Sequence, residues 1–327
     1  GTCCVNLYYL QKQADGVHEI GEELGFDQYV VRREQPKQPA KASSAITWQE
    51  DRRAVIVTGA DFRYVWNRCT GLFDEMTAGQ MTYCKQPQQW NIWRAPTDND
   101  REIAPVWRQA GYDRALVRVY DSGVRQTEDG IELWANAALN AIHIQHIVDL
   151  TVCWTIAGDG SVHLRVDGKR NGQMPFLPRF GLRLFLPHDF ETVDYLGYGP
   201  LESYIDKHQA SKFGRYRDTV TGLHEDYIRP QENGSHYGCT RLEIVSDRGA
   251  VIEVTGDSFS FNASHYTQEE LEHKAHNFEL TPCDATVLCL DYKMSGVGSN
   301  SCGPKLAEAY QMCETQFTWE LDLRLNR

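Results

Sequence analysis

The chain has 327 residues, which is enough for two or three ordinary domains, or for one large all-β domain with part of another. Its net charge of −12 argues against a nucleic-acid or anionic-membrane partner, because phosphate groups would be repelled, and favours a neutral or cationic ligand. No apolar run approaches the roughly 18 residues of a membrane-spanning helix, so the sequence predicts a globular protein without a membrane partner.

Two strand-like stretches open the chain, at residues 4–11 and 26–33, and an acidic segment joins them. Residues 33–44, REQPKQPAKASS, are rich in Pro, Lys and Ser and are typical of a linker. The chain starts without Met and enters a strand at once. We therefore expect it to be cut from a longer protein, with residues 1–39 as the end of a preceding β-sandwich plus a linker. The compartment, cytoplasmic or periplasmic, is left open.

From Ile46 onward, apolar and polar residues alternate in short runs bounded by turn residues, the pattern of antiparallel strands. Helical exceptions are predicted at 104–111, after Pro200, and at 267–276, where Thr267 is placed to cap the helix with Glu270 three residues on. Many strands without alternating helices predict one large antiparallel sandwich over residues 40–327. The strand runs are 46–59, 62–79, 115–123, 130–139, 143–170 and 180–187.

Acidic residues alternate at Asp98, Asp100 and Glu102, which suggests a calcium loop. Counted from Asp98, such a loop needs Gly at its sixth position and Glu at its twelfth, and this chain has Ile103 and Gln109 there. A polar turn is the better interpretation. The ten cysteines contain no CxxC pair and no zinc-type spacing, so we expect mostly reduced thiols and no metal site.

Two acidic constellations are candidates for acid and base chemistry. Glu202 and Asp206 lie four residues apart and would share one face of a helical turn, as a glycosidase pair can. Glu232 and His236 flank a predicted Asn-Gly turn and are either an acid/base pair or two solvated polar residues. A glycine-rich stretch at 294–306 predicts an exposed loop, which either contacts a ligand or only connects two strands.

Five segments in register carry a family resemblance. In order and spacing, from about Lys41 to Leu325, the chain resembles the C-terminal part of the large bacterial β-galactosidases of glycoside hydrolase family 2. The resemblance implies an all-β fold, a large antiparallel supersandwich of the galactose-mutarotase-like type, preceded by a β hairpin remnant of an immunoglobulin-like sandwich. The segments are WRAPTDNDR, the stretch 196–220, the stretch 224–244, the stretch 259–276 and MSGVGSNSCGP.

The resemblance also implies an activity for the parent enzyme, the retaining hydrolysis of terminal β-D-galactosides by two glutamates. In the family both glutamates, together with magnesium and sodium, belong to a TIM barrel that precedes this region. The chain is therefore expected to carry no catalytic residue and no cofactor of its own, and to be inactive alone. Its expected partners are the barrel of the same enzyme and the β-galactoside substrate, within a homo-oligomer.

In the family, this C-terminal domain closes one side of the substrate pocket. Cys302 matches the position at which the best-known member offers a Trp to the sugar, and a thiol has no stacking face. Glu102 stands where that member has a glycine, so we expect less motion over 101–106. The expected substrate-binding residues are Asp98, Asn99, Asp100, Arg101, Glu102, Ser299, Asn300, Ser301 and Cys302.

The resemblance changes the interpretation of the stretch 196–220. Glu202 and Asp206 become parts of a polar scaffold packed near residues 229–234. Three alternatives to the C-terminal domain stay open: the small subunit of a two-chain β-galactosidase; a free-standing carbohydrate-binding module that stacks sugars on Tyr198, Tyr204 and Trp107; and an aldose epimerase, which needs a His and a Glu facing each other across a cleft.

Overall fold

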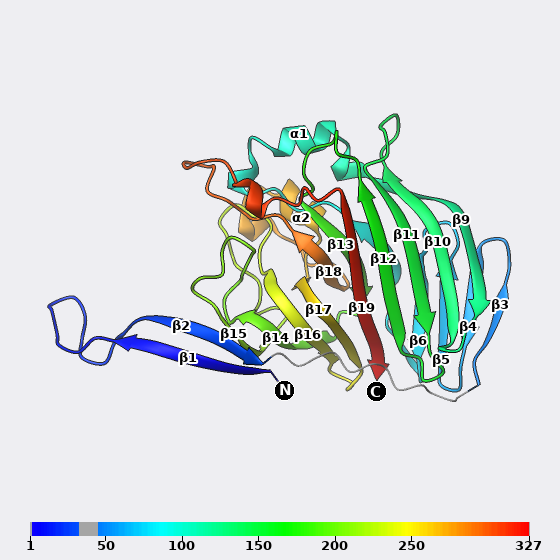
Figure 1. Cartoon of the computed structure of the whole chain (residues 1–327), viewed down its shortest axis with the longest axis horizontal. Coiled ribbons are helices and arrows are strands. Elements are labelled where there is room, and N and C mark those ends of the chain that lie inside the picture. The colour runs from blue at the N-terminus through cyan, green and yellow to red at the C-terminus, as the bar shows by residue number, and fades with distance from the viewer. Residues whose placement is uncertain (1, 33–44, 327) are drawn as a thin grey trace.

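Three antiparallel sheets make up the computed structural model, which describes residues 2–32 and 45–326 (Figure 1). The all-β, antiparallel class is confirmed, and each strand run expected between residues 46 and 187 contains one or two strands. The linker predicted at 33–44 lies outside the described residues. None of the helices in the described residues is long and apolar enough to cross a membrane.

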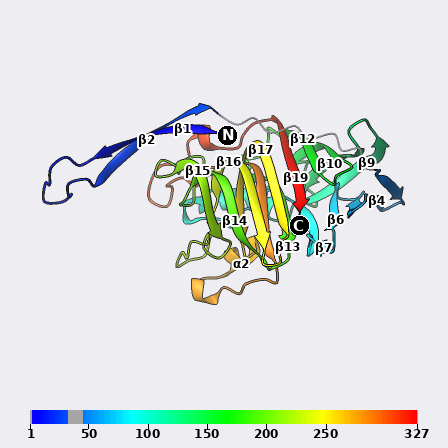
Figure 2. The same ribbon diagram turned by 90° about the horizontal axis from the view of Figure 1, so that it is seen from below.

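The first sheet is a hairpin of β1 (Cys3–Leu10) and β2 (Glu23–Arg32) that projects from the body of the molecule (Figures 1 and 2). It contacts the edge strand β15 (Lys212–Thr219) through Gln28, whose amide donates to the carbonyl of Phe213 at 2.8 Å and accepts its N–H at 2.7 Å. The ammonium of Lys212 lies 4.4 Å from the ring centres of Tyr8 and Phe26. That the hairpin ends an immunoglobulin-like sandwich, with a boundary near residue 39, stays a prediction.

The two larger sheets share the core. Phe73 and Trp154, one from each sheet, meet edge to face with ring centres 5.0 Å apart, and the Trp154 indole donates to the carbonyl of Gly71 at 2.9 Å. The five-stranded sheet has the order β3 (Thr47–Glu50), β4 (Ala54–Thr58), β5 (Phe62–Asn67), β6 (Leu72–Ala78) and β7 (Met81–Thr82).

The main sheet has twelve strands, nine of them along one path. Its strands alternate buried and outward-facing residues: in β11 (Val148–Ile156), Leu150, Val152 and Trp154 point into the core while the residues between them face outward. β18 (Thr286–Met294) pairs with β17 (Val251–Ser264) and with β13 (Arg179–Leu186), and β13 also pairs with β8 (Gln86–Asn91). The nine are β15, β14 (Phe190–Gly199), β16 (His236–Ser246), β17 (Val251–Ser264), β19 (Gln316–Asn326), β12 (Val162–Arg170), β11 (Val148–Ile156), β10 (Ile131–Asn140) and β9 (Leu116–Gln126).

Helices are short and lie at the ends of strands. Two predicted helices are present, α1 (Ala104–Gln109) and α2 (Gln268–His273), and Thr267 caps α2 by accepting the N–H of Glu270 at 3.1 Å. The helical turn predicted after Pro200 is wrong, because residues 201–210 form turns and one short bridge instead. The 3₁₀ turns are η1 (Asp98–Asp100), η2 (Tyr112–Arg114), η3 (Asn277–Glu279) and η4 (Glu308–Tyr310).

Candidate functional site

The turn at residues 97–102 is built around one buried ion pair. Arg94 holds Asp100 through two hydrogen bonds, Nε to Oδ2 at 3.0 Å and Nη2 to Oδ1 at 2.8 Å, and both side chains are buried. Asp100 Oδ2 also accepts the N–H of Thr97 at 2.9 Å. Fork-to-fork pairing of this kind fixes orientation as well as distance. Asp100 therefore anchors the turn from within, while Asp98, Arg101 and Glu102 are exposed.

The same arginine reaches the glycine-rich segment that begins at Ser295. Arg94 donates to the carbonyl of Ser295 at 2.6 Å and to that of Gly296 at 3.0 Å. Asn99 adds a second link, since its amide donates to the carbonyl of Gly298 at 2.7 Å and accepts the N–H of Ser301 at 2.9 Å. The structure thus brings the two predicted site segments, 98–102 and 299–302, side by side, although about 200 residues separate them in the sequence.

A third segment, which contains Asp206, also supports the glycine-rich loop. The carboxylate of Asp206 accepts the N–H of Val297 at 3.0 Å and that of Gly298 at 2.7 Å. A Cβ on Gly296 would lie 2.4 Å from the Asp206 carboxyl carbon, and Gly298 has a φ of +65°, so both positions require glycine. Spacing alone gives no signal for this contact.

Glu202 does not stack with Asp206. Its carboxylate accepts hydrogen bonds from the hydroxyls of Tyr227 at 2.5 Å and Tyr204 at 3.2 Å, and from the N–H of Gly234 at 3.0 Å, and it pairs with Lys207. Burial alone would raise the pKa of Glu202, but the hydrogen bonds from Lys207 and Tyr227 outweigh it and lower that pKa. The predicted carboxylate pair is wrong, and the scaffold interpretation fits these contacts.

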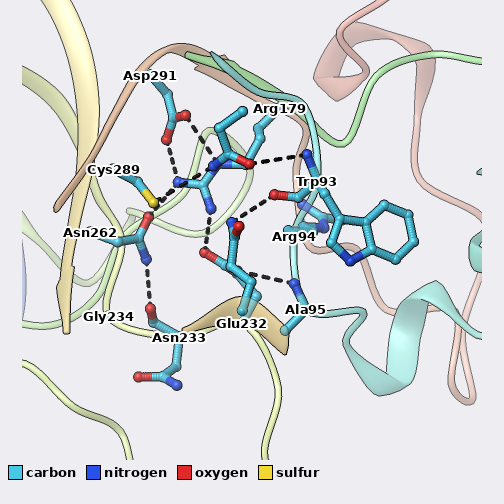
Figure 3. A network of polar contacts seen from close by, with 12 residues as sticks. Trp93, Arg94, Ala95, Arg179, Glu232, Asn233, Gly234, Asn262, Cys289 and Asp291 are labelled. Atoms are coloured by element: carbon cyan, nitrogen blue, oxygen red, sulfur yellow. Dashed lines mark hydrogen bonds and ion pairs between the residues drawn. The ribbon is translucent and has the colours of Figure 1, made fainter. Parts of the chain in front are cut away.

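Glu232 belongs to a buried network centred on Arg179 (Figure 3). Arg179 donates to Glu232 at 2.7 Å, to Asn262 at 2.9 Å and to both carboxylate oxygens of Asp291. Burial raises the pKa of Asp291 to about 6, although Arg179 opposes the shift. Glu232 also binds Ala95 twice, accepting its N–H at 3.3 Å and donating its own N–H to the Ala95 carbonyl at 3.0 Å.

The hypothesis of a Glu232–His236 acid/base pair is wrong. His236 is buried against Phe261 and Tyr195, and its Nδ1 lies 3.4 Å from the carbonyl of Tyr198. Burial lowers the pKa of His236 to about 4, so the ring is neutral at physiological pH. Both side chains are buried, so the alternative of two solvated polar residues is wrong as well.

The remaining predicted site residues lie along the outer rim of the two loops. Ser299 accepts the N–H of Gly303 at 2.7 Å, which closes a tight turn and leaves Cys302 exposed; Asn300 and Ser301 are partly exposed. Glu102 lies 3.6 Å from the ammonium of Lys305. Among the described residues, no group of three or more His, Cys, Asp or Glu lies close enough together to hold a metal ion.

The segment 101–106, expected to move little, contains the start of α1. Trp107 of that helix is fully buried and donates its indole N–H to the carbonyl of Phe176 at 2.9 Å. Trp107 and Tyr204, proposed as sugar-stacking aromatics, are both buried, so that part of the carbohydrate-binding-module hypothesis is wrong.

A family model described as the beta galactosidase small chain matches residues 58–324. The chain belongs to the β-galactosidase small-chain family. Curated relatives of this small-chain region are the β-galactosidase of Actinobacillus pleuropneumoniae, 40% identical over 98% of this chain and 32% of the relative, and that of Staphylococcus xylosus, 36% identical over 98% and 32%. This chain therefore spans about a third of the length of the β-galactosidases that it matches.

Among solved structures, the small-chain domain is similar to a putative aldose 1-epimerase from Escherichia coli K12. The TM-score is 0.42 at 10% identity, and the match covers 86% of this chain and 99% of that one. A putative mutarotase from Salmonella typhimurium gives a TM-score of 0.42 at 8% identity, covering 86% and 94%.

Proposed function

We propose that this chain is the non-catalytic C-terminal domain of a β-galactosidase that hydrolyses terminal β-D-galactosides with retention. Its role is to stabilise the enzyme and to complete the aglycone side of an active site whose two glutamates lie in the preceding barrel. The relatives support the parent activity, because those that match over almost all of this chain carry the name β-galactosidase.

The proposed role at the aglycone side rests on one observation, the two hydrogen bonds that join Asn99 to Gly298 and Ser301. They join two loops whose polar and charged side chains form a rim, exposed or partly exposed, on a base held by the buried Arg94–Asp100 pair. Hydroxyl and amide groups in fixed positions suit a neutral sugar, since they can donate and accept hydrogen bonds without a charged partner. The rim residues are Asp98, Asn99, Arg101, Glu102, Ser299, Asn300, Ser301 and Cys302.

The test is a chimera in which this chain replaces the matching third of the Actinobacillus pleuropneumoniae enzyme. We expect the chimera to hydrolyse o-nitrophenyl β-D-galactoside and lactose, and the isolated chain to hydrolyse neither. In the chimera, Asn99→Ala is expected to raise KM for lactose more than KM for the nitrophenyl substrate, because only lactose has a sugar as aglycone. Equal changes in the two KM values would contradict the placement of the rim at the aglycone side.

A further inference from the structure

A groove crosses the outer face of the main sheet. It is a cavity of about 800 Å³, a size that is typical of small-molecule sites. The neighbouring strands β9, β10, β11, β12 and β19, which Figure 1 shows side by side, form its floor. Four strand spacings separate β9 from β19, so the groove spans roughly 19 Å. The residues that line it share no position with the two loops of the candidate site.

The floor of the groove consists of two rows of polar side chains. Each row has one residue per strand at positions opposite each other in the register, and the residues between the two rows are buried. Two hydrogen bonds fix the first row, from the Thr151 hydroxyl to Asn136 at 3.2 Å and from the Thr318 hydroxyl to Asp167 at 2.6 Å. The first row is Asn136, Thr151, Asp167 and Thr318, and the second is Asp149, Lys169 and Gln316.

At the β9 end, the groove is lined by an aromatic side chain that a chain of hydrogen bonds holds in place. The hydroxyl of Tyr120 lies 2.7 Å from Nε2 of His146, and Nδ1 of that ring lies 2.7 Å from the carboxylate of Asp149. Asp149 accepts from Nδ1, so the neutral imidazole accepts the Tyr120 hydroxyl at Nε2. The ring of Tyr120 is still 53% exposed. A fixed and half-exposed aromatic ring offers a face on which a ligand can stack.

The segment that carries His146 is itself anchored. The side-chain amide of Asn171 donates to the carbonyl of His146 at 3.1 Å, and the N–H of Asn171 donates to the carbonyl of Ile147 at 2.9 Å. The N–H of Ile147 donates to the carbonyl of Leu139 at 2.8 Å. The groove therefore has its shape before any ligand binds, which lowers the entropy that binding costs.

The charges around the groove are close to balance. Asp167 is held by Arg165 through two hydrogen bonds of 3.1 Å, and Asp149 stands opposite Lys169 in the register. Within residues 2–32 and 45–326, the ammonium of Lys169 and the side-chain amide of Gln316 have no hydrogen-bond or ion-pair partner, so both are available to a ligand. A balanced groove gains little from a charged ligand, whereas hydroxyl groups can pair with its donors and its acceptors alike.

We propose that this groove binds a neutral oligosaccharide, with one sugar ring stacked on Tyr120 and the hydroxyl groups of the chain bonded to the two polar rows. The exposed aromatic face, the fixed polar groups and the balanced charge select a carbohydrate. The length of the groove selects more than one sugar ring. This binding site is separate from the rim of the candidate site, and it does not depend on the proposed function.

The test is titration calorimetry of this chain with galactotetraose. Tyr120→Ala removes the stacking face, and Tyr29→Ala is the matched control, because Tyr29 is 57% exposed and lies on the hairpin strand β2. Both variants are expected to melt at the temperature of the unmodified chain, since neither changes a buried side chain. We expect galactotetraose to bind at least 5-fold more weakly to Tyr120→Ala and with unchanged affinity to Tyr29→Ala.

Four results would overturn the proposal. The first is that galactotetraose does not bind the unmodified chain, and the second is that it binds Tyr120→Ala and Tyr29→Ala equally well. The third is that Asn99→Ala weakens binding while Tyr120→Ala does not, which would place the sugar at the rim of the candidate site. The fourth is that lactobionate, a derivative of lactose with a carboxylate, binds more tightly than lactose, which would show a site for anions.

Discussion

The carboxylate of Asp206 accepts the backbone N–H of Gly298 at 2.7 Å, and this contact holds a loop that the sequence marks only as flexible. Asp206 accepts the N–H of Gly298 and Asn99 donates to its carbonyl, so both side chains hold the same residue. The glycine-rich loop is therefore shaped before any ligand arrives. Its glycines allow the tight turns, and hydrogen bonds from the neighbouring side chains restrict the motion of its backbone.

Replacing Asp206 with Ala should loosen this loop without unfolding the domain. Two hydrogen bonds to a carboxylate are lost, each worth on the order of 1.5–3 kcal/mol to the local structure. We expect the amides of residues 297–303 to exchange with solvent at least 10-fold faster, measured by hydrogen–deuterium exchange of the isolated chain. Glu128→Ala, at an exposed turn far from the loop, is the control. Unchanged exchange in Asp206→Ala would show that Arg94 and Asn99 suffice.

Replacing Glu232 with Ala should be among the most destabilising single changes in the chain. The substitution removes one of the carboxylates that pair with the buried Arg179, and it removes the acceptor for the N–H of Ala95. Breaking a buried ion pair in this way costs about 3–5 kcal/mol. Urea unfolding of the isolated chain measures the loss, and Glu128→Ala again serves as the control. A change below about 1 kcal/mol would mean that water replaces the missing carboxylate.

His236 should make the protein sensitive to mild acid. Burial lowers its folded-state pKa to about 4, whereas the unfolded chain has the ordinary value near 6.5. Between these values only the unfolded state binds the proton, so stability falls as the pH drops from 6.5 toward 4, by about 3 kcal/mol in total. Above pH 6.5 the residue has no such effect.

The variant His236→Phe keeps an aromatic ring against Phe261 and Tyr195 but cannot be protonated. Unfolding free energies measured from pH 7.5 to 4.5 should therefore decline less steeply in His236→Phe than in the unmodified chain. His273→Phe, at an exposed position, should keep the full decline. Parallel curves for all three proteins would exclude His236 as the source of the acid sensitivity.

Cys302→Trp should restore a stacking face at the rim of the candidate site. Cys302 is exposed, so the larger side chain meets little steric resistance. Stacking on a sugar ring is worth about 0.5–1.5 kcal/mol, a reduction of roughly 2–10-fold in KM for lactose. The measurement uses the chimera, with Cys69→Trp at a remote exposed site as the control. An unchanged KM would place position 302 out of reach of the aglycone.

Most of the fold could be predicted from the sequence, and much of the site could not. Alternation of apolar and polar residues gave the strands β3 to β6 and β9 to β13, whereas β7 and β8 lie outside the expected runs. Local hydrogen-bonding rules gave the Thr267 cap of α2, because a cap depends on neighbouring residues. Composition and the family resemblance also singled out the two loops of the candidate site, whose role in binding stays a prediction. The scaffold role of Glu202 fits the structure, but the individual partners of Glu202 and Asp206 could not be predicted, since they include residues in distant segments.

The sequence by itself determined that this is an antiparallel β protein, because apolar and polar residues alternate in each short run with the two-residue period of a strand. It also determined which loops are polar. Only the tertiary structure decided that Glu232 pairs with Arg179 rather than His236, and that Asn99 meets Gly298. The physical reason is that a side chain's partner depends on which strands become neighbours, and strand order in a sheet is set by packing of the whole chain.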